Sequence, residues 1–184
     1  KNINFLMVSR LLYDKGVVEF INASRSLIDN NCFADFTLIG DYDINNPSSL
    51  DPKIINHWKS FKNTNYLGFK KDIKNYLINS DVVILPSYRE GMPKILLEAS
   101  SIGRAIITTN VPGCKECVID NKNGFVIEPK NTEKIVLAMM KFVTDKNLIH
   151  TMGIESRKIA EKEYSIYKVI RDHLSIYDSI LKHD

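Results

Sequence analysis

Residues 82–98 read VVILPSYREGMPKILLE, and this stretch decides the fold class. It begins with an apolar, mostly β-branched run, which is typical of a strand buried on both faces of a parallel sheet. Pro93 suits the first turn of a helix, where its missing N–H costs nothing, and Gly91 permits an unusual turn just before it. A strand that leads through a short loop into a helix is the repeating unit of an α/β doubly wound domain.

The same alternation extends outward in both directions from this stretch. Runs typical of strands occupy residues 3–8, 35–39, 64–67, 82–85, 105–108 and 125–127. Helical patterns accompany them at residues 15–30, 52–61, 72–79, 93–102 and 132–144. We therefore predict an α/β fold with a Rossmann-like doubly wound parallel sheet flanked by helices, in which ligands bind beyond the carboxyl ends of the strands.

The chain of 184 residues has the size of one domain, and we predict a single domain over residues 1–184. Because it enters an expected core strand directly after Lys1, we interpret it as part of a longer protein; a processed or tag-cleaved chain is the alternative. Residues 147–184 form a predicted helical tail. Its apolar stripe packs either on its own domain or on a preceding one, and consists of Ile166, Val169, Ile170, Leu174, Tyr177, Ile180 and Leu181.

Composition and charge exclude several functional classes. The 25 basic and 22 acidic side chains leave a net charge of +3, too small to indicate a nucleic-acid partner. No apolar run reaches the ~18 residues that a membrane span needs, and no signal peptide is recognisable. The odd number of cysteines disfavours a disulfide framework and favours a reducing cytoplasm.

Two cations follow the first predicted strand. Arg10 lies at its end, and Lys15 precedes Gly16 where the first helix is expected to begin. A helix N-terminus disfavours cations and attracts anions, so the pair makes sense if a phosphate lies between the two side chains. Two solvated charges are the alternative.

Two carboxylates follow the fourth predicted strand. Glu90 lies in the loop before the helix, and Glu98 lies on the helix directly after the apolar run Ile95-Leu96-Leu97. A carboxylate buried there is costly unless it is paired or used, and one that faces a cleft accepts hydrogen bonds from a pair of sugar hydroxyls. A helix-surface glutamate is the alternative for Glu98.

Arg10-Leu11-x-x-x-Lys15-Gly16 followed by Glu90-x7-Glu98 resembles the C-terminal, donor-binding domain of family-4 retaining glycosyltransferases with the GT-B architecture. The resemblance runs from residue 10 to residue 129. It includes Ile39-Gly40-Asp41 after the second strand and Tyr66-Leu67-Gly68-Phe69, the segment along which the nucleobase lies in that family. The ordered set is more specific than any one of its motifs.

The resemblance implies a role for each matching residue. Arg10 and Lys15 hold the donor diphosphate and stabilise the leaving charge. Glu90 contacts the sugar hydroxyls, and Glu98 contacts the ribose. The other donor-binding residues that it implies are Gly40, Gly68, Phe69, Gly91, Met92, Lys94 and Ile95. It implies no metal or other cofactor, and the histidines are scattered, at His57, His150, His173 and His183.

The loop before the helix departs from many relatives, which carry Gly-Phe-Gly where this chain has Gly91-Met92-Pro93, and Pro93 has no amide to donate. Together with VPGCKE at residues 111–116, this form resembles the branch that builds capsule, O-antigen and lipid-linked glycans, where UDP-hexose and UDP-N-acetylhexosamine donors are common. The implied enzyme is a hexosyltransferase. Its partners are a nucleotide-sugar donor and a glycan or polyprenyl-linked acceptor, the latter bound by an N-terminal domain that this chain lacks.

From that resemblance we expect the isolated chain to be inactive and the protein to be cytoplasmic. Peripheral association with the inner face of the plasma membrane depends on whether Lys70, Lys71 and Lys122 form a basic rim or are simply solvated.

Two other functions stay open. One is a different GT-B enzyme that uses a sugar nucleotide, such as an epimerase or a synthase. Dependence of the activity on an acceptor distinguishes such an enzyme from the glycosyltransferase. The other is a non-catalytic nucleotide-binding or interaction module. NAD is disfavoured, because Gly-x-Gly-x-x-Gly is absent after the first strand. Cys114 and Cys117 supply only two ligands, too few for a zinc site.

Overall fold

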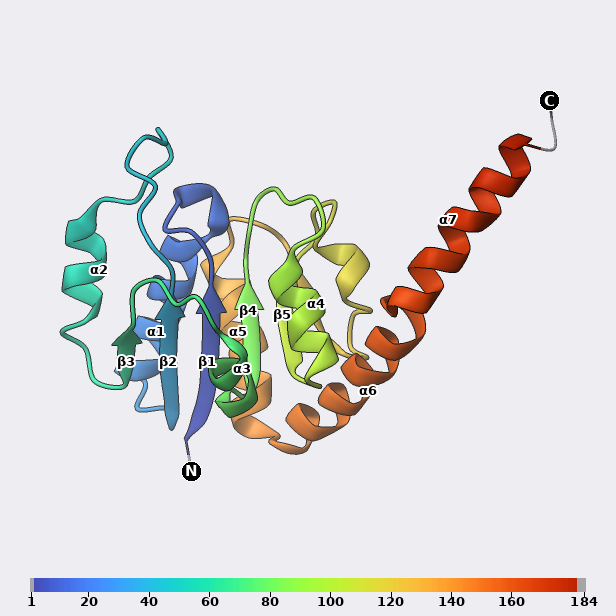
Figure 1. Cartoon of the computed structure of the whole chain (residues 1–184). Coiled ribbons are helices and arrows are strands. Elements are labelled where there is room, and N and C mark those ends of the chain that lie inside the picture. The colour runs from blue at the N-terminus through green and yellow to red at the C-terminus, as the bar shows by residue number, and fades with distance from the viewer. Residues whose placement is uncertain (1, 182–184) are drawn as a thin grey trace.

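The computed structural model describes residues 2–181, and its centre is a six-stranded sheet. All neighbouring strands are parallel, in the order β3-β2-β1-β4-β5-β6 (Figure 1). The strands are β1 (Ile3–Val8), β2 (Ala34–Ile39), β3 (Thr64–Tyr66), β4 (Val82–Leu85), β5 (Ala105–Thr109) and β6 (Gly124–Ile127). The predicted Rossmann-like doubly wound sheet is confirmed.

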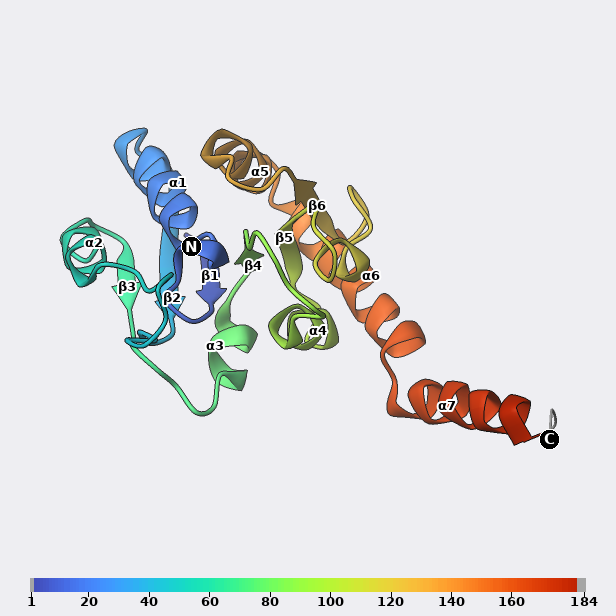
Figure 2. The same ribbon diagram turned by 90° about the horizontal axis from the view of Figure 1, so that it is seen from above.

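Helices cover both faces of the sheet, as the view along the strands in Figure 2 shows. On one face lie α1 (Val17–Asp29) and α5 (Thr132–Thr144), which pack on each other. On the other face lie α3 (Lys74–Asn79) and α4 (Lys94–Ser101). The remaining helical segments are the 3₁₀ turns η1 (Tyr13–Lys15) and η2 (Lys115–Cys117), α2 (Pro52–Trp58) beside β3, and α6 (Asn147–Glu163) against α4 and β5.

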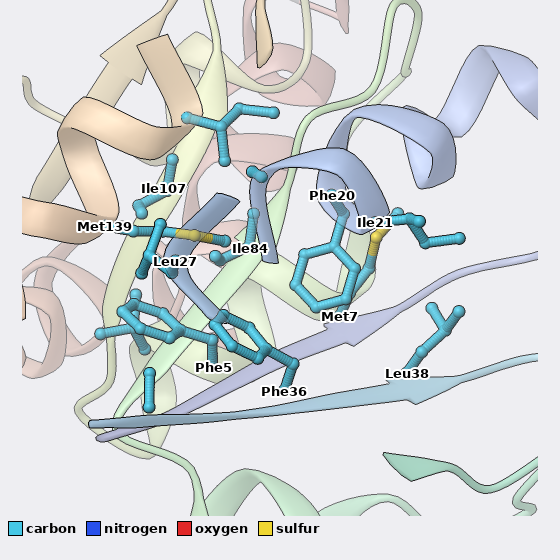
Figure 3. Packing of buried hydrophobic residues seen from close by; sticks show 14 of the residues in the cluster. Phe5, Met7, Phe20, Ile21, Leu27, Phe36, Leu38, Ile84, Ile107 and Met139 are labelled. Atoms are coloured by element: carbon cyan, nitrogen blue, oxygen red, sulfur yellow. The ribbon is translucent and has the colours of Figure 1, made fainter. Parts of the chain in front are cut away.

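Alternate residues of the central strands face two separate apolar cores. Phe5 and Met7 of β1 face α1 and α5, whereas Leu6 faces the opposite core. The Phe5 ring stacks on Phe36 with centroids 5.7 Å apart, and Figure 3 shows this pair beneath α1. Because both faces are covered, these strands are apolar at nearly every position, as the sequence predicts.

Trp58, the one tryptophan of the chain, is a core residue. It is fully buried, and its indole Nε1 donates a 2.8 Å hydrogen bond to Ser24 Oγ on α1. The helix that carries it, α2, begins at a capping Asp51 followed by Pro52, a favourable helix start. Trp58 therefore anchors α2 to the sheet.

The predicted first helix begins two residues later than expected. Gly16 has φ +72°, so the chain turns there, and residues 13–15 form η1 instead of helix. Lys15 consequently projects from a tight turn between β1 and α1. Most other differences are likewise at helix ends, where frayed or capping residues decide the bound.

The C-terminal tail is not one continuous helix as predicted. It breaks at Tyr164 and Ser165, where the Ser165 hydroxyl accepts a hydrogen bond from Lys168 N and so starts a new helix. This helix, α7 (Ile166–Leu181), projects away from the domain in Figure 1, and none of its residues is buried. The apolar stripe therefore does not pack on its own domain. Residues 182–184 of the predicted tail lie outside the described part.

None of the helices within residues 2–181 is long and apolar enough to cross a bilayer.

Candidate functional site

The loops after β1 and β4 meet at the carboxyl edge of the sheet, where the strand order changes direction. In a doubly wound fold this is the position at which ligands bind. Lys15 from the first loop donates through Nζ to Glu90 Oε1 of the second at 2.8 Å. Only 14% and 16% of these side chains are exposed. Partial burial strengthens this ion pair relative to one on the surface.

The backbone next to both residues is joined by one buried hydroxyl. Ser87 Oγ lies 3.1 Å from the carbonyl oxygen of Asp14 and 3.2 Å from that of Arg89. These carbonyls belong to the residues immediately before Lys15 and Glu90. The Asp14 carbonyl also accepts a 2.8 Å hydrogen bond from Tyr88 N. The spacing of Lys15 and Glu90 is thus set by backbone contacts as well as by their charges.

Two glycines hold the loop 86–91 from opposite sides. A Cβ on Gly16 would overlap the Pro86 carbonyl, and a Cβ on Gly113 would overlap the Gly91 carbonyl. Both glycines also have positive φ, at +72° and +85°. The loop that carries Glu90 therefore lies between two backbone surfaces that only glycine can provide.

Arg10 lies just beyond the end of β1, and its guanidinium pairs with a different carboxylate from the one that Lys15 contacts. Its Nη1 donates a 2.8 Å hydrogen bond to Asp43 Oδ2, and 59% of the Arg10 side chain is exposed. Asn46 also donates to Asp43, at 3.4 Å. The two predicted phosphate-binding cations thus each have a carboxylate partner, one on the β2 side of the edge and one on the β4 side.

A cavity of about 450 Å³ opens beside Arg10, at the carboxyl ends of β1 and β2. Gly40 and Phe69, both predicted to bind the donor, line it. Gly40 N donates to the Gly68 carbonyl at 3.1 Å, and the Tyr66 hydroxyl donates to the Gly40 carbonyl at 3.1 Å. The predicted nucleobase segment therefore borders a real cavity, with the Phe69 ring largely exposed.

A larger cavity, about 560 Å³, lies at the opposite edge of the sheet and is lined by Arg104, His150 and Arg157 among others. We assign the site to the smaller cavity, because the carboxyl ends of the strands converge there.

Glu98 is not a buried carboxylate in an apolar run. It lies on the α4 surface with 33% of its side chain exposed, and Lys94 Nζ pairs with its Oε1 at 3.3 Å. The helical period turns Glu98 away from buried Leu96, so of the two alternatives that the sequence left open, a helix-surface glutamate describes its position. Its contact with a ribose stays a prediction. Gly91, Met92 and Lys94 are exposed at the start of this helix, and Ile95 is partly buried.

Three further residues of the site could not be identified from the sequence. Asp43 gave no signal, since it stands in a polar loop. Ser87 and Tyr88 belong to the predicted motif, but their roles depend on contacts with Asp14 and Glu19, which are distant in the chain. Side-chain contacts between distant residues leave no local pattern in one sequence.

The thiols of Cys114 and Cys117 are both buried. Burial raises the pKa of Cys117 to about 12 and also raises the pKa of Cys114. Both thiols are therefore protonated at neutral pH, which is the opposite of a reactive thiolate. Within residues 2–181, no group of three or more His, Cys, Asp or Glu residues could hold a metal ion.

Comparison with known proteins identifies relatives of this chain. The family model described as "Glycosyl transferases group 1" matches residues 1–159. The N,N'-diacetylbacillosaminyl-diphospho-undecaprenol alpha-1,3-N-acetylgalactosaminyltransferase of Campylobacter jejuni is 31% identical over 99% of this chain and 48% of its own length. The UDP-Gal:alpha-D-GlcNAc-diphosphoundecaprenol alpha-1,3-galactosyltransferase of Escherichia coli is 32% identical over 94% of this chain and 44% of its own.

The fold has a close counterpart among solved structures. Anabaena HepE, crystallised in complex with UDP, superposes with a TM-score of 0.85 at 20% identity, over 97% of this chain and 49% of the HepE chain. The present chain spans about half the length of the curated relatives it matches. Since the family model covers residues 1–159 of 184, this chain belongs to the group 1 glycosyl transferases.

Proposed function

We propose that this chain is the donor-binding half of a retaining glycosyltransferase, which transfers a sugar from a nucleoside diphosphate to a glycan. The observation that carries the proposal is the Lys15–Glu90 ion pair. It unites a cation and a carboxylate from the two loops at the point where the strand order reverses. A diphosphate sugar needs both kinds of group, one for its phosphates and one for its hydroxyls.

Each residue of the edge takes one part of the donor in this proposal. Lys15 and Arg10 bind the diphosphate and stabilise the charge that develops on it as the glycosidic bond breaks. Arg10 exchanges the Asp43 carboxylate for a phosphate oxygen, which its exposure allows. Glu90 accepts hydrogen bonds from the sugar, and Glu98 from the ribose.

The nucleotide is UDP in this proposal, and the sugar is a hexose or an N-acetylhexosamine. Its base enters the cavity beside Gly40 and Phe69. Two findings support UDP: the structural counterpart HepE was crystallised with UDP, and the E. coli relative is named for a UDP-Gal donor. We further propose that the cationic side chains serve without a metal ion.

The acceptor is a cell-surface glycan or its polyprenyl-linked precursor, and the enzyme works at the cytoplasmic face of the membrane. The names of both relatives specify a diphospho-undecaprenol acceptor, which supports this assignment. The acceptor site belongs to an N-terminal domain, and the apolar stripe of α7 packs on that domain. The isolated chain then binds donor without transferring sugar.

The proposal is tested by calorimetric titration of the 184-residue chain with UDP, GDP, ADP and NAD, in buffer containing EDTA. We expect UDP to bind in EDTA and its binding to be lost in the double variant Arg10→Ala/Lys15→Ala. The charge-matched control is Lys59→Ala/Lys62→Ala, which removes two exposed cations near α2 and should bind UDP like the wild type.

The other outcomes each correct a specific part of the proposal. Preference for ADP or GDP would replace the proposed base. Binding that requires added magnesium would contradict metal independence. Failure to bind any nucleotide would contradict a donor-binding role for this chain on its own.

A further inference from the structure

We propose that Tyr88 is a positioning residue for Glu90, which ties the Glu90 loop to α1 and so controls binding of the donor's sugar rather than its nucleotide. This inference rests on the proposed function, in which Glu90 contacts the sugar. Tyr88 lies two positions before Glu90 and contacts neither Lys15 nor the cavity beside Arg10 among the interactions found within residues 2–181.

Tyr88 contacts two segments that are far from it in the chain, the stretch after β1 and the turn before α5. Its hydroxyl donates a short hydrogen bond to Glu19 Oε1 in the first turn of α1. Its backbone N–H donates to the Asp14 carbonyl at 2.8 Å, directly before Lys15. From the turn before α5, Lys130 Nζ lies over the Tyr88 ring, 5.0 Å from its centroid.

The charged groups around the Tyr88 ring make the hydrogen bond from its hydroxyl to Glu19 hard to replace. Glu19 Oε2 and Asp14 Oδ1 are both buried and have no hydrogen-bond partner among the described residues. Burial, the hydrogen bond to Glu19 and the charges of Glu19 and Asp14 raise the pKa of Tyr88, so the phenol remains a donor at any physiological pH. Without the Tyr88 hydroxyl, the partly buried Glu19 carboxylate would lose the one hydrogen-bond donor that it has among residues 2–181.

Lys130 completes the arrangement from the opposite side. The Lys130 backbone has φ +59°, a conformation that is uncommon in residues other than glycine. This conformation brings the ammonium to the ring face, where it attracts the π electrons and partly balances the two carboxylates. The hydroxyl of Tyr88 is thus held by the Glu19 carboxylate and its ring by the Lys130 ammonium.

The position of Tyr88 predicts which part of the donor it affects. The loop 86–91 carries Glu90, whereas the cavity assigned to the nucleobase is formed by the ends of β1 and β2. Movement of this loop therefore changes contacts with the sugar and leaves the base contacts in place. A residue with a purely structural role would weaken UDP and UDP-sugar binding together.

The test compares binding of UDP with that of UDP-glucose, UDP-galactose and their N-acetylated forms, measured on the 184-residue chain and on Tyr88→Phe. We expect UDP affinity within twofold of the wild type and a loss of about fivefold or more for the best UDP-sugar, the size expected when one typical hydrogen bond is removed. Tyr66→Phe is the matched control, because it removes a tyrosine hydrogen bond on the cavity side. It should weaken UDP and UDP-sugar equally.

Two further variants show whether Tyr88 acts through Glu19. Glu19→Ala should reproduce the Tyr88→Phe effect, and the double variant should be no weaker than either single variant. Glu19→Gln keeps an acceptor and should restore part of the sugar-dependent affinity. Additive effects in the double variant, or an unchanged ratio of UDP-sugar to UDP affinity in Tyr88→Phe, would overturn the proposal.

A measurement without ligand separates this inference from the proposed function. Amide hydrogen exchange of residues 88–91 should be at least tenfold faster in Tyr88→Phe, while residues 64–69 exchange as in the wild type. Unchanged exchange would refute the positioning role even if UDP binds. If the wild-type chain binds no nucleotide, the proposed function of the chain fails, and the exchange experiment alone decides the role of Tyr88.

Discussion

Lys15 and Glu90 are separated by 75 positions in the chain, yet Lys15 Nζ and Glu90 Oε1 lie 2.8 Å apart. The pair closes the gap between the turn after β1 and the loop after β4, which neighbour each other because those two strands pair in the sheet. The Asp14 carbonyl accepts hydrogen bonds from the Ser87 hydroxyl and from Tyr88 N, and these hold the two loops in the same register. The ion pair is therefore supported by the fold on both sides.

Removing one member of this pair should destabilise the domain more than removing both. Lys15→Met leaves the Glu90 carboxylate without its partner in a place where 16% of its side chain is exposed. We expect the free energy of unfolding to fall by about 1–3 kcal/mol, and the double variant Lys15→Met/Glu90→Gln to recover part of that loss. Urea unfolding of the wild type, the two single variants and the double variant measures the coupling between the two side chains. Additive losses, in which the double variant loses the sum of the two single variants, would mean that the two side chains are not coupled.

Gly113→Ala should damage the Glu90 loop, and Gly68→Ala is its matched control. Both glycines have positive φ, so each alanine costs about 1–2 kcal/mol in backbone strain. A Cβ at Gly68 meets nothing within 4 Å, whereas one at Gly113 overlaps the Gly91 carbonyl. We therefore expect Gly113→Ala to lower the melting temperature clearly further than Gly68→Ala. Similar melting temperatures would contradict the close approach of the two loops.

Ser87→Ala should weaken UDP-sugar binding without unfolding the protein. The variant removes the buried hydroxyl between the carbonyls of Asp14 and Arg89, and we expect a loss of about 1–2 kcal/mol in stability. Ser101→Ala is the control, because its hydroxyl bonds only within exposed α4. Calorimetry with a UDP-sugar compares the two variants, and equal affinities would show that this hydroxyl does not support the site.

Alkaline pH should destabilise the protein through Cys117. Burial raises the pKa of this thiol to about 12 in the folded state, while the unfolded chain ionises it near its ordinary value of about 8.5. Above that pH the unfolded state binds fewer protons than the folded state, so the free energy of unfolding falls as pH rises. The contribution is at most about 1.4 kcal/mol per pH unit, over the window between about pH 8.5 and the folded-state pKa of about 12.

Cys117→Ala should flatten this decline, as measured by urea unfolding at several pH values. The control Val118→Ala removes a neighbouring buried group and should lower stability by the same amount at each pH. An equally steep decline in Cys117→Ala would assign the pH dependence to other groups.

Removal of α7 should leave the stability of the domain unchanged. None of the residues Ile166–Leu181 is buried, so a chain that ends at Ser165, and keeps the Tyr164 hydrogen bond to the Glu116 carbonyl, should unfold within about 0.5 kcal/mol of the wild type. Met152→Asp in α6 is the contrasting variant, because Met152 is buried in the core below that helix and a charge there has no partner. A large destabilisation on truncation would mean that α7 contributes to this domain.

The order of strands and helices could be predicted from the sequence because each buried strand is apolar at nearly every position. The runs at Ile3–Val8 and Val82–Leu85 are found where they were predicted. The helix ends were less predictable, since they depend on single conformations such as the positive φ of Gly16 and on the Ser165 cap.

The candidate site was only partly predictable for a related reason. Motif spacing identified Lys15 and Glu90 separately, but their ion pair depends on the pairing of β1 with β4. The partner of Arg10 was missed because Asp43 lies in a loop without pattern. The position of Glu98 stayed open in the sequence, because an apolar neighbourhood in sequence covers both faces of a short helix, and only one of them is buried.

The strand order also determines how this domain is made on the ribosome. β1 lies in the middle of the sheet, but its neighbour β4 is translated 75 or more positions later. At about 5–20 residues per second, the β4 side of β1 waits roughly 4–15 s for its partner. During that interval Phe5 and Leu6, which later pair with Val82 and Val83, lie on an unpaired apolar edge. The nascent chain should therefore bind a holdase chaperone most strongly until β4 has left the exit tunnel.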